Sequence, residues 1–492
     1  MSAAAVWSVD PRSGKRRERV ATEATAADVD RAVRAAHAVR ESLADRTVRA
    51  AFLRAAADLL DASADEVVAT ADAETALGAP RLTGELARTS AQLRAFAEVV
   101  EDGAYLDVRI DLPDPSAVPP RPDLRRWKVP LGVVAVYAAS NFPLAFSVPG
   151  GDTASALAAG CPVVVKAHPD HPATSELAAG LLRRAAAKAG LPEDVVVLVH
   201  GFDAGVELVR HPLVAAAGFT GSVRGGRALF DAAAARPVPI PFHGELGSLN
   251  PVVITPGAVA ERAEETGAGL AGSMTLGAGQ FCTKPGFVLA PAGADGDRFL
   301  DALTEGVAQA GPAVLLDHRM RAAFVEGVTE RAALDGVEAP VVPGAADEHT
   351  VTAGVLTVDA ARLADGGHEL LLEECFGPVT VVARYTDEAE VTAVLGRLPG
   401  NLTATLHCAD DDPAAPALLA ALTPLAGRVL VGGWPTGVAV APAQHHGGPY
   451  PATTSTSTSV GATAIERWLR PVTYQSVPRH LLPPELRDAP GA

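Results

Sequence analysis

This chain of 492 residues has few cysteines, no net positive charge and no long apolar run. The sequence has four cysteines, and they lie too far apart for a zinc knuckle or a CxxC redox pair: Cys161, Cys282, Cys375 and Cys408. Such sparse use is typical of free thiols in a reducing cytoplasm. The formal net charge of −17 disfavours nucleic acid and anionic membranes as partners.

No stretch of about 18 uncharged apolar residues occurs, which disfavours a membrane-spanning helix. Residues 1–20 place apolar positions before basic ones, the reverse of a secretory signal. With 48% hydrophobic and 20% charged residues, the composition is that of a globular protein. The length favours two or more domains.

Two patterns follow one another in the first half of the chain, a helical one and then an alternation of strands and helices. Residues 25–100 have apolar positions at helical spacing, beginning with a capping box at Thr25 and Asp28. After a proline-rich break at 112–122, short β-rich runs alternate with Ala/Leu-rich helices, which predicts a parallel sheet covered by helices. The β-rich runs are 131–140, 162–168, 194–201 and 214–222, and the helices between them are 153–160 and 173–190.

A second α/β stretch covers about 246–444 and includes the apolar runs 251–256 and 377–385. The low-complexity segment 453–461 is expected to be a surface loop. The tail 465–478 is strand-like, and 121–130 is its plausible partner. An exposed pair of strands with aromatic residues is a candidate subunit contact.

Cys282 lies in the most informative segment, GAGQFCTKPG (277–286). The glycines let the backbone approach a ligand, so this thiol need not belong to a core. Attack on a carbonyl requires the thiolate, which nearby positive charge stabilises, and Lys284 is a candidate for that charge. The other three cysteines have apolar or strand neighbours and are interpreted as small buried hydrophobes.

Glu245 and Asn141 are the candidate partners of Cys282. Glu245 lies between glycines in HGELG (243–247), where it is either a solvated charge or a general base with a pKa raised by burial. Asn141 follows the strand at 131–140 and is either an ordinary turn residue or a donor to an oxyanion. A nucleophile with a base favours acyl-enzyme hydrolysis.

Two segments suggest a dinucleotide. GFTGSVRGGRALF (218–230) reads as strand, glycine turn and helix, and Gly221, Ser222 and Gly226 can bring backbone N–H groups to a phosphate, although GxGxxG is absent. Lys166 ends its strand and is either an ordinary solvated lysine or a contact to a ribose or a phosphate. EECFGPV (373–379) offers Glu374 to a ribose and Phe376 to a flat ring.

His445 and His446 suggest a metal, but adjacent histidines usually point in different directions. They also lack carboxylate or thiolate companions in the sequence around them, so no metal site is predicted.

Together these segments resemble the aldehyde dehydrogenase superfamily from DPRSGK (10–15) to the tail. Six motifs occur in that family's order: Asn-Phe-Pro after a strand, a strand-end lysine, FTGS, a Glu-Leu-Gly turn, GQxC and EExFGPV. The resemblance implies an α/β fold with two Rossmann-like parallel-sheet domains and a small β oligomerisation element. It implies a dinucleotide-binding domain at 1–105 and 129–245, a catalytic domain at 246–445, and oligomerisation strands at 106–128 and 464–485.

The resemblance also implies roles. Cys282 would be the nucleophile, Glu245 the base, and Asn141 with the Cys282 backbone N–H the oxyanion hole. The cofactor residues would be Lys166 at the adenosine ribose, Gly221, Ser222 and Gly226 at the pyrophosphate, Glu374 at the nicotinamide ribose and Phe376 beside the ring. The cofactor would be NADP or NAD. Pro169 stands where NAD-preferring relatives carry a glutamate, which slightly favours NADP. Lys284 replaces a common asparagine and suggests a basic substrate entrance.

Within the superfamily the chain looks most like the 2-oxoglutarate semialdehyde (2,5-dioxovalerate) dehydrogenases, through 140–168, 277–286 and 446–454. This implies oxidation of that aldehyde to the acid by a homodimer or homotetramer. The alternatives are a broad-specificity or fatty aldehyde dehydrogenase, a CoA-acylating dehydrogenase, and a non-catalytic binding protein on the same scaffold.

Overall fold

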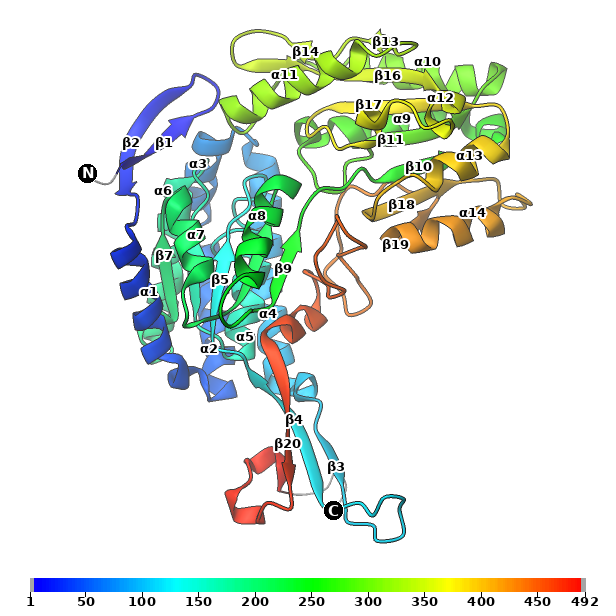
Figure 1. Ribbon diagram of the computed structural model, residues 1–492. Helices are drawn as coiled ribbons and strands as arrows, with labels where there is room; N and C mark the ends of the chain where they lie inside the picture. Colours follow the sequence, from blue (N-terminus) through cyan, green and yellow to red (C-terminus); the bar gives the residue numbers. More distant parts are fainter. Residues whose placement is uncertain (1–3, 488–492) are drawn as a thin grey trace.

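The computed structural model describes residues 4–487, which form two α/β bodies and a slender β extension (Figure 1). The first body contains the N-terminal helices and a five-stranded sheet. The second contains a seven-stranded sheet and its helices. No helix among the described residues is long and apolar enough to cross a membrane.

The sheet of the first body is parallel throughout and has the order β7-β6-β5-β8-β9. Its strands are β5 (Val133–Tyr137), β6 (Val163–Lys166), β7 (Val196–Val199), β8 (Val214–Thr220) and β9 (Phe242–Glu245). Val134 and Val136 face one apolar core and Val133 and Ala135 face the other. Strands buried on both faces read as continuous apolar runs, which is why the sequence predicted this sheet.

Helices cover both faces of this sheet (Figure 1). One layer contains α2 (Arg46–Ala62), α4 (Ala79–Asp102), α5 (Gly151–Ala159) and α6 (Pro172–Lys188), with α3 (Ala64–Thr75) packed against α4 and α6. The other contains α1 (Ala26–Ala38), α7 (Phe202–Arg210) and α8 (Val223–Ala234). The capping box predicted at Thr25 and Asp28 begins α1, so this prediction is confirmed.

The sheet of the second body has the order β13-β16-β17-β11-β10-β18-β19. Its strands are β10 (Pro251–Ile254), β11 (Phe287–Pro291), β13 (Glu338–Val341), β16 (Gly354–Asp359), β17 (Val379–Tyr385), β18 (Asn401–His407) and β19 (Ala426–Val431). All pairings are parallel except that of the edge strand β13 with β16. The apolar runs predicted at 251–256 and 377–385 contain β10 and β17.

Helices cover this second sheet on both faces too. One layer is formed by α9 (Pro256–Thr275) and α10 (Ala294–Ala308), which pack together. The other is formed by α11 (His318–Ala332), α12 (Ala360–Ala364), α13 (Glu388–Leu395) and α14 (Ala415–Leu422). A small sheet of β12 (Ala313–Val314), β14 (Gly344–Ala345) and β15 (Thr350–Thr352) lies beside α11.

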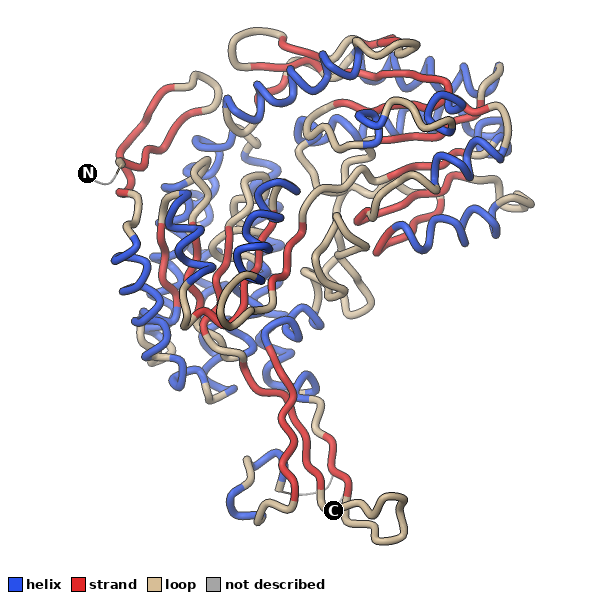
Figure 2. Tube along the Cα trace, viewed as in Figure 1, coloured by secondary structure: helices blue, strands red, loops and turns tan. Residues whose placement is uncertain are grey.

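The extension is an antiparallel sheet of β20 (Leu469–Gln475), β4 (Leu124–Pro130) and β3 (Arg109–Asp111). Figure 2 shows these three strands projecting away from both bodies. Val472 lies opposite Trp127, so the predicted pairing of 121–130 with 465–478 is confirmed.

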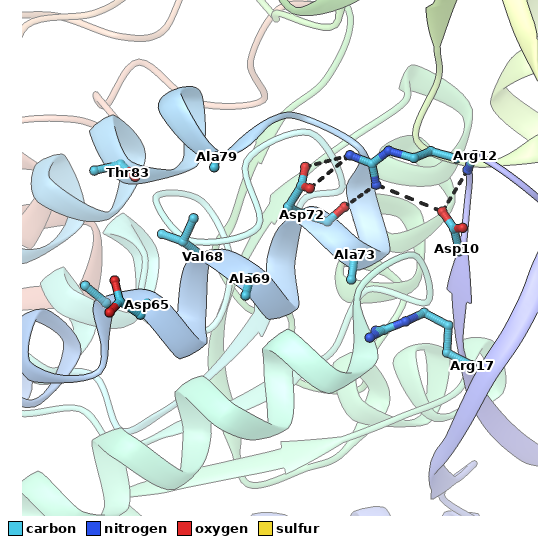
Figure 3. A pocket seen from close by; sticks show the side chains of 11 residues that line it. Asp10, Arg12, Arg17, Asp65, Val68, Ala69, Asp72, Ala73, Ala79 and Thr83 are labelled. Atoms are coloured by element: carbon cyan, nitrogen blue, oxygen red, sulfur yellow. Dashed lines mark hydrogen bonds and ion pairs between the residues drawn. The ribbon is translucent and has the colours of Figure 1, made fainter.

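The N-terminal hairpin of β1 (Ala5–Asp10) and β2 (Lys15–Thr22) is joined to α3 by an arginine. The guanidinium of Arg12 donates to the carboxylate of Asp72 at 2.9 Å and to its carbonyl at 2.8 Å (Figure 3). Beside this contact lies an open groove of about 700 Å³. None of the predicted site residues lines it, so the groove is separate from the site described below.

The segment 453–461 is a loop, as predicted, but its expected place at the surface is wrong. Thr453 forms a β-bridge with Glu245, and the Thr454 backbone N–H donates to the Gly244 carbonyl at 2.9 Å. Thr458 is buried. The segment continues the edge of the first sheet beside β9, and its hydroxyl groups find hydrogen-bond partners inside the fold. A Ser/Thr repeat fits such a place because each hydroxyl can both donate and accept.

The two sheets approach each other at the ends of their strands. Tyr137, Lys166, Thr220 and Glu245 lie at the carboxyl ends of their strands in the first sheet. In the second sheet, the segment carrying Cys282 leads into the amino end of β11. The candidate residues therefore gather between the carboxyl edge of one sheet and the amino edge of the other. Ligands commonly bind at such a carboxyl edge.

Candidate active site

Cys282 lies on a loop between the short helix η4 (Leu276–Gly279) and β11. The chain turns sharply before it, because Gly277 and Ala278 have φ values of 56° and 59°. The side chain of Asn250 then fixes the loop from behind. Its Nδ2 donates to the Cys282 carbonyl at 2.8 Å and to the Lys284 carbonyl at 2.9 Å. These contacts hold the Cys282 backbone while the residue keeps partial exposure.

Glu245 and His446 surround the thiol. The Nε2 atom of His446 lies 3.7 Å from Cys282 Sγ and 3.2 Å from Glu245 Oε2. The Ser459 hydroxyl donates to the same Oε2 at 3.2 Å. Glu245 is 3% exposed and His446 is 2% exposed. The Oε1 atom of Glu245 is buried and has no partner among residues 4–487, so one carboxylate oxygen is free to accept a hydrogen bond.

Burial and neighbouring charges set the protonation of this cluster. Burial raises the pKa of the Cys282 thiol well above its usual range, and the Glu245 charge adds to that effect, while Arg88 opposes it. Burial also acts to raise the pKa of Glu245, but the charge and hydrogen bond of His446 outweigh it and leave that pKa lowered. The sequence-based expectation of a raised Glu245 pKa is wrong, because it did not include the contact with His446 from a distant part of the chain. The result is a protonated thiol beside an ionised base.

Asn141 joins the cluster from the first sheet. Its Nδ2 donates to the Gln280 carbonyl at 3.1 Å, two residues before the nucleophile. Arg81 holds it from the other side, through a 2.7 Å hydrogen bond from Nη2 to the Asn141 carbonyl. The residue is buried. An amide fixed this close to the Cys282 loop is suited to donate to a developing oxyanion.

Lys284 does not line an entrance and does not stabilise a thiolate. Its side chain is 2% exposed, and Nζ donates to the carbonyls of Cys375 at 3.0 Å and Val379 at 2.7 Å. Burial lowers its pKa to about 8. The prediction of a basic entrance made by Lys284 is therefore wrong. This side chain joins the Cys282 loop to the segment leading into β17.

The predicted cofactor residues fall into two groups. Lys166 and Ser222 lie at the carboxyl edge of the first sheet, at the end of β6 and just after β8. Burial lowers the pKa of Lys166 to about 8, and Nζ donates no hydrogen bond to any described residue. Glu374 and Phe376 lie on the segment before β17, on the side of the second sheet.

Gly221 and Gly226 also have structural roles that do not depend on a cofactor. The Gly221 N–H donates to the Glu245 carbonyl at 3.0 Å, and a Cβ on Gly226 would collide with Leu246 and Phe219. The Ser222 hydroxyl accepts from the Gly225 N–H as the N-cap of α8. Contacts of Gly221, Ser222 and Gly226 with a pyrophosphate remain predictions. The free N–H donors in this region lie at the N-terminus of α8.

Glu374 approaches the catalytic cluster more closely than the sequence suggested. Burial raises its pKa to about 7, against the opposing charge of Lys284. The charge of Glu374 helps to raise the pKa of the Cys282 thiol, and the charge of Glu245 helps to raise the pKa of Glu374. Phe376 is half-buried two residues further along.

Two arginines of α4 were missed by the sequence analysis. Arg81 lies over the rings of Phe142 and Phe281, 5.1 and 4.6 Å from their centroids, and Arg88 lies 5.2 Å from the centroid of Phe146. Phe281 directly precedes the nucleophile. Nε and Nη1 of Arg81 and Nε and Nη2 of Arg88 are buried without hydrogen-bond partners among the described residues. Their spacing of seven puts both on one helix face, but that signal alone does not identify a ligand.

His446 was also misread. The expectation that this pair lacks carboxylate and thiolate companions is wrong, because Cys282 lies 164 positions earlier in the chain and still contacts it. The glycines that follow His446 were the available signal. His445 points elsewhere and contacts the Gly427 region instead.

Comparison with known proteins shows the family of this chain. The family model described as the aldehyde dehydrogenase family matches residues 2–470. The chain is 48% identical over 473 residues to alpha-ketoglutaric semialdehyde dehydrogenase 2 of Azospirillum brasilense, covering 95% of this chain and 90% of the relative. It is 42% identical over 478 residues to the alpha-ketoglutaric semialdehyde dehydrogenase of Acinetobacter baylyi, with coverages of 95% and 90%.

Solved structures match the fold. Aldehyde dehydrogenase 21 from Physcomitrella patens, in complex with succinate, superposes with a TM-score of 0.81 at 19% identity, covering 96% of this chain and 95% of that one. A glyceraldehyde-3-phosphate dehydrogenase from Methanocaldococcus jannaschii, complexed with NADP, gives 0.81 at 18% identity, with coverages of 96% and 99%. The fold predicted from the sequence is confirmed. The chain belongs to the aldehyde dehydrogenase family and is an NAD(P)-dependent aldehyde dehydrogenase.

Proposed function

We propose that this protein oxidises 2-oxoglutarate semialdehyde to 2-oxoglutarate. The observation that carries this substrate is the pair of buried guanidinium groups on α4. Burial lowers the pKa of Arg81 and of Arg88, and each group keeps N–H donors without partners. Leaving such donors unpaired in a dry site is costly, so a ligand that supplies an anion is strongly favoured.

Both arginines interact with residues of the catalytic cluster. Arg81 binds the Asn141 carbonyl, and the Arg88 charge interacts with those of Cys282 and Glu245. Glu85 lies between the two on the same helix; burial raises its pKa, and its Oε1 accepts from the backbone of Leu144 and Ala145 and not from either guanidinium. An aldehyde with a carboxylate a few bonds away would therefore place its anion on Arg81 and Arg88 while its carbonyl reaches Cys282. The names of the two relatives described above point to the same substrate.

Each residue of the cluster then acts in its own step of the reaction. The ionised Glu245 takes the thiol proton of Cys282 and releases it to solvent, and the sulfur then attacks the aldehyde carbon while Asn141 Nδ2 and the Cys282 backbone N–H donate to the oxygen. The nicotinamide, when bound, supplies the hydride acceptor. Glu245 afterwards takes a proton from the water that hydrolyses the thioester. A polar cavity of about 10 Å³ adjoins Glu245, His446 and Ser459, which is the size of one water molecule.

The residues at the edge of the first sheet suit a dinucleotide. Among the described residues the Lys166 ammonium group has no hydrogen-bond acceptor, and the first turn of α8 presents the N–H groups of Val223 and Arg224, since Ser222 accepts from those of Gly225 and Gly226. We propose a dinucleotide-binding domain at 1–105 and 129–245 and a catalytic domain at 246–445.

NADP is the favoured cofactor. Pro169 brings no charge to the end of β6, and the neighbouring Asp170 is buried and forms an ion pair with Arg319 at 3.0 Å. Burial raises the pKa of Asp170 to about 8. A carboxyl group held neutral or paired does not repel a 2′-phosphate as a free glutamate would. The ratio of kcat/KM for NADP and NAD measures this preference.

Hydrolysis to the free acid is favoured over transfer to coenzyme A, because Glu245 keeps an unpartnered oxygen for a water. The decisive experiment compares kcat/KM for 2-oxoglutarate semialdehyde, butanal, decanal and benzaldehyde, and identifies the product with and without coenzyme A. The proposal expects the keto-acid aldehyde to be preferred and a free acid to form under both conditions. Equal rates for butanal, or a product that depends on coenzyme A, would overturn it.

We also propose that β3, β4 and β20 form the contact in a homodimer or homotetramer, because this thin sheet projects away from both bodies (Figure 2). Light scattering of the intact protein and of Thr473→Glu, at an exposed position of β20, checks this. The variant should lose mass if the sheet is the interface.

A further inference from the structure

The cluster around the nucleophile offers three different ligand atoms to one point. Cys282 Sγ, His446 Nε2 and a carboxylate oxygen of Glu245 all lie within 4.8 Å of one another. Sulfur, imidazole nitrogen and carboxylate oxygen are the ligands that Zn²⁺ takes in proteins. We propose that this cluster is a reversible binding site for Zn²⁺, and that the bound ion inhibits the enzyme.

The separations of these atoms fit a single zinc ion. With metal–ligand bonds of about 2.0–2.3 Å in tetrahedral geometry, neighbouring ligand atoms lie about 3.3–3.6 Å apart. The observed distances are 3.2 Å from His446 Nε2 to Glu245 Oε2 and 3.7 Å from the same nitrogen to Cys282 Sγ. Each differs from the ideal separation by only about 0.1 Å. The third pair, Cys282 Sγ and the Glu245 carboxylate, lies within 4.8 Å, so only these two side chains have to move closer together to complete the site.

The backbones that carry the ligands are already fixed. The His446 N–H donates to the Thr458 hydroxyl at 2.8 Å, and the Ser459 N–H donates to the His446 carbonyl at 2.9 Å. Asn250 holds the Cys282 carbonyl, and Glu245 ends a strand of the first sheet. Three protein ligands leave the fourth tetrahedral position for a water, the pattern of a zinc site with one open position.

The charges and protons balance. Zn²⁺ replaces the thiol proton of Cys282, which is released to solvent, and the thiolate and the Glu245 carboxylate together neutralise the dication. The imidazole binds through Nε2 as the neutral ring with its proton on Nδ1. The lone pair that attacks the aldehyde is then held by the metal, so Zn²⁺ and the aldehyde exclude each other. The binding geometry does not depend on which aldehyde is the substrate, whereas the inhibition rests on Cys282 being the nucleophile.

The binding test uses the metal alone and a spectroscopic signal. Chelator-treated full-length protein is titrated with Co²⁺, whose thiolate charge-transfer band and strong visible bands report a four-coordinate site with sulfur, and Zn²⁺ is then added to displace it. We expect one ion per chain. The absence of a thiolate band in the wild type would overturn the proposal.

Matched variants identify the ligands. His446→Gln removes one ligand, while His445→Gln changes the adjacent histidine outside the cluster. Loss of an outer partner alone costs 10–100-fold in metal affinity, so loss of this ligand should cost more than about 100-fold. His445→Gln should bind as the wild type does. Glu245→Gln is a second ligand variant, which serves if His446→Gln melts at a lower temperature than the wild type. Equal affinity of wild type and both ligand variants would place the ion elsewhere.

Kinetics separate this site from the proposed function. Zn²⁺ should inhibit competitively with the aldehyde, for any aldehyde that is turned over, and a chelator should restore full activity. Binding with the expected spectrum but without competition would show that Cys282 is not the attacking group. Competition with an unexpected preferred aldehyde would leave the zinc site in place and overturn only the substrate.

Discussion

The Nε2 atom of His446 lies 3.2 Å from Oε2 of Glu245, and this contact leaves the other carboxylate oxygen free. One oxygen is held by the imidazole and by Ser459, while Oε1 stays available for a water. The same contact lowers the pKa of the carboxyl group despite its burial. A buried carboxylate without this partner would tend to be protonated and would be a poorer base.

Replacing the nucleophile is the first test. Cys282→Ala should lower kcat by about 10⁴-fold or more, as removal of a covalent nucleophile does in other enzymes. Cys408→Ala is the matched control, because that thiol packs beside the second core, away from the cluster. Its kcat should stay at the wild-type value. Steady-state NAD(P)H formation measures both, and substantial turnover by Cys282→Ala would contradict the assignment.

Glu245→Gln should separate the two halves of the reaction. The amide keeps the size of the side chain but cannot accept the proton of the attacking water, so hydrolysis should slow by about 10²–10⁴-fold. Stopped-flow absorbance should show one equivalent of NAD(P)H per active site followed by a stalled phase, and mass spectrometry should show an acyl adduct on Cys282. A steady rate without a burst, at unchanged kcat, would contradict the role.

Removing the imidazole should move the acid limb of the pH–rate profile. The pKa of Glu245 is lowered by His446, so the base is ionised down to a lower pH than an isolated buried carboxyl group would be. In His446→Gln that pKa rises, and kcat/KM should be lost at a higher pH as the solution is acidified. His445→Gln should leave the limb in place. An acid limb unmoved in His446→Gln would show that another group controls it.

Much of the fold was readable from sequence because its strands are apolar runs between helices. The β-rich runs at 131–140, 162–168 and 214–222 became β5, β6 and β8, and the capping box at Thr25 begins α1. These features depend on local patterns. The pairing of β4 with β20 was also predicted, since both segments are strand-like and lie outside the two bodies.

Only part of the site could be predicted from the sequence, because its charged residues come from distant segments of the chain. Cys282, Glu245 and Asn141 stand in short motifs with local signals, and the structure brings them together. His446 has no local companion, and its partners arrive through the pairing of 453–461 with β9. Lys284 was misjudged for the opposite reason, since a lysine near a glycine turn looks exposed until the fold closes around it.

The arginines of α4 give a prediction about substrate charge. Arg88→Gln should lower kcat/KM for 2-oxoglutarate semialdehyde relative to butanal by about 10–150-fold, the value of a charge-assisted hydrogen bond of about 1.5–3 kcal/mol. The ratio is the readout, because a changed charge near Cys282 affects both aldehydes alike. Arg94→Gln is the matched control on the same helix, where the side chain is partly exposed and pairs with Asp58 and Asp61. An unchanged ratio in Arg88→Gln would assign the acid end of the substrate to other residues.

Lys284→Met should change stability and leave substrate choice alone. The ammonium group satisfies the carbonyls of Cys375 and Val379, so its loss leaves two buried acceptors unpaired and should cost about 1–3 kcal/mol. The folded-state pKa of Lys284 is lowered to about 8, so the unfolded chain binds its proton more tightly. The stability of the wild type relative to the variant should therefore increase as pH rises from about 8 towards the unfolded value near 10.4. Denaturant unfolding at pH 7 and pH 10 measures this difference. The preference for an acidic aldehyde over butanal should be the same in both proteins, because Nζ points to backbone carbonyls and not to the substrate. A lost preference in Lys284→Met would restore a basic entrance at this residue.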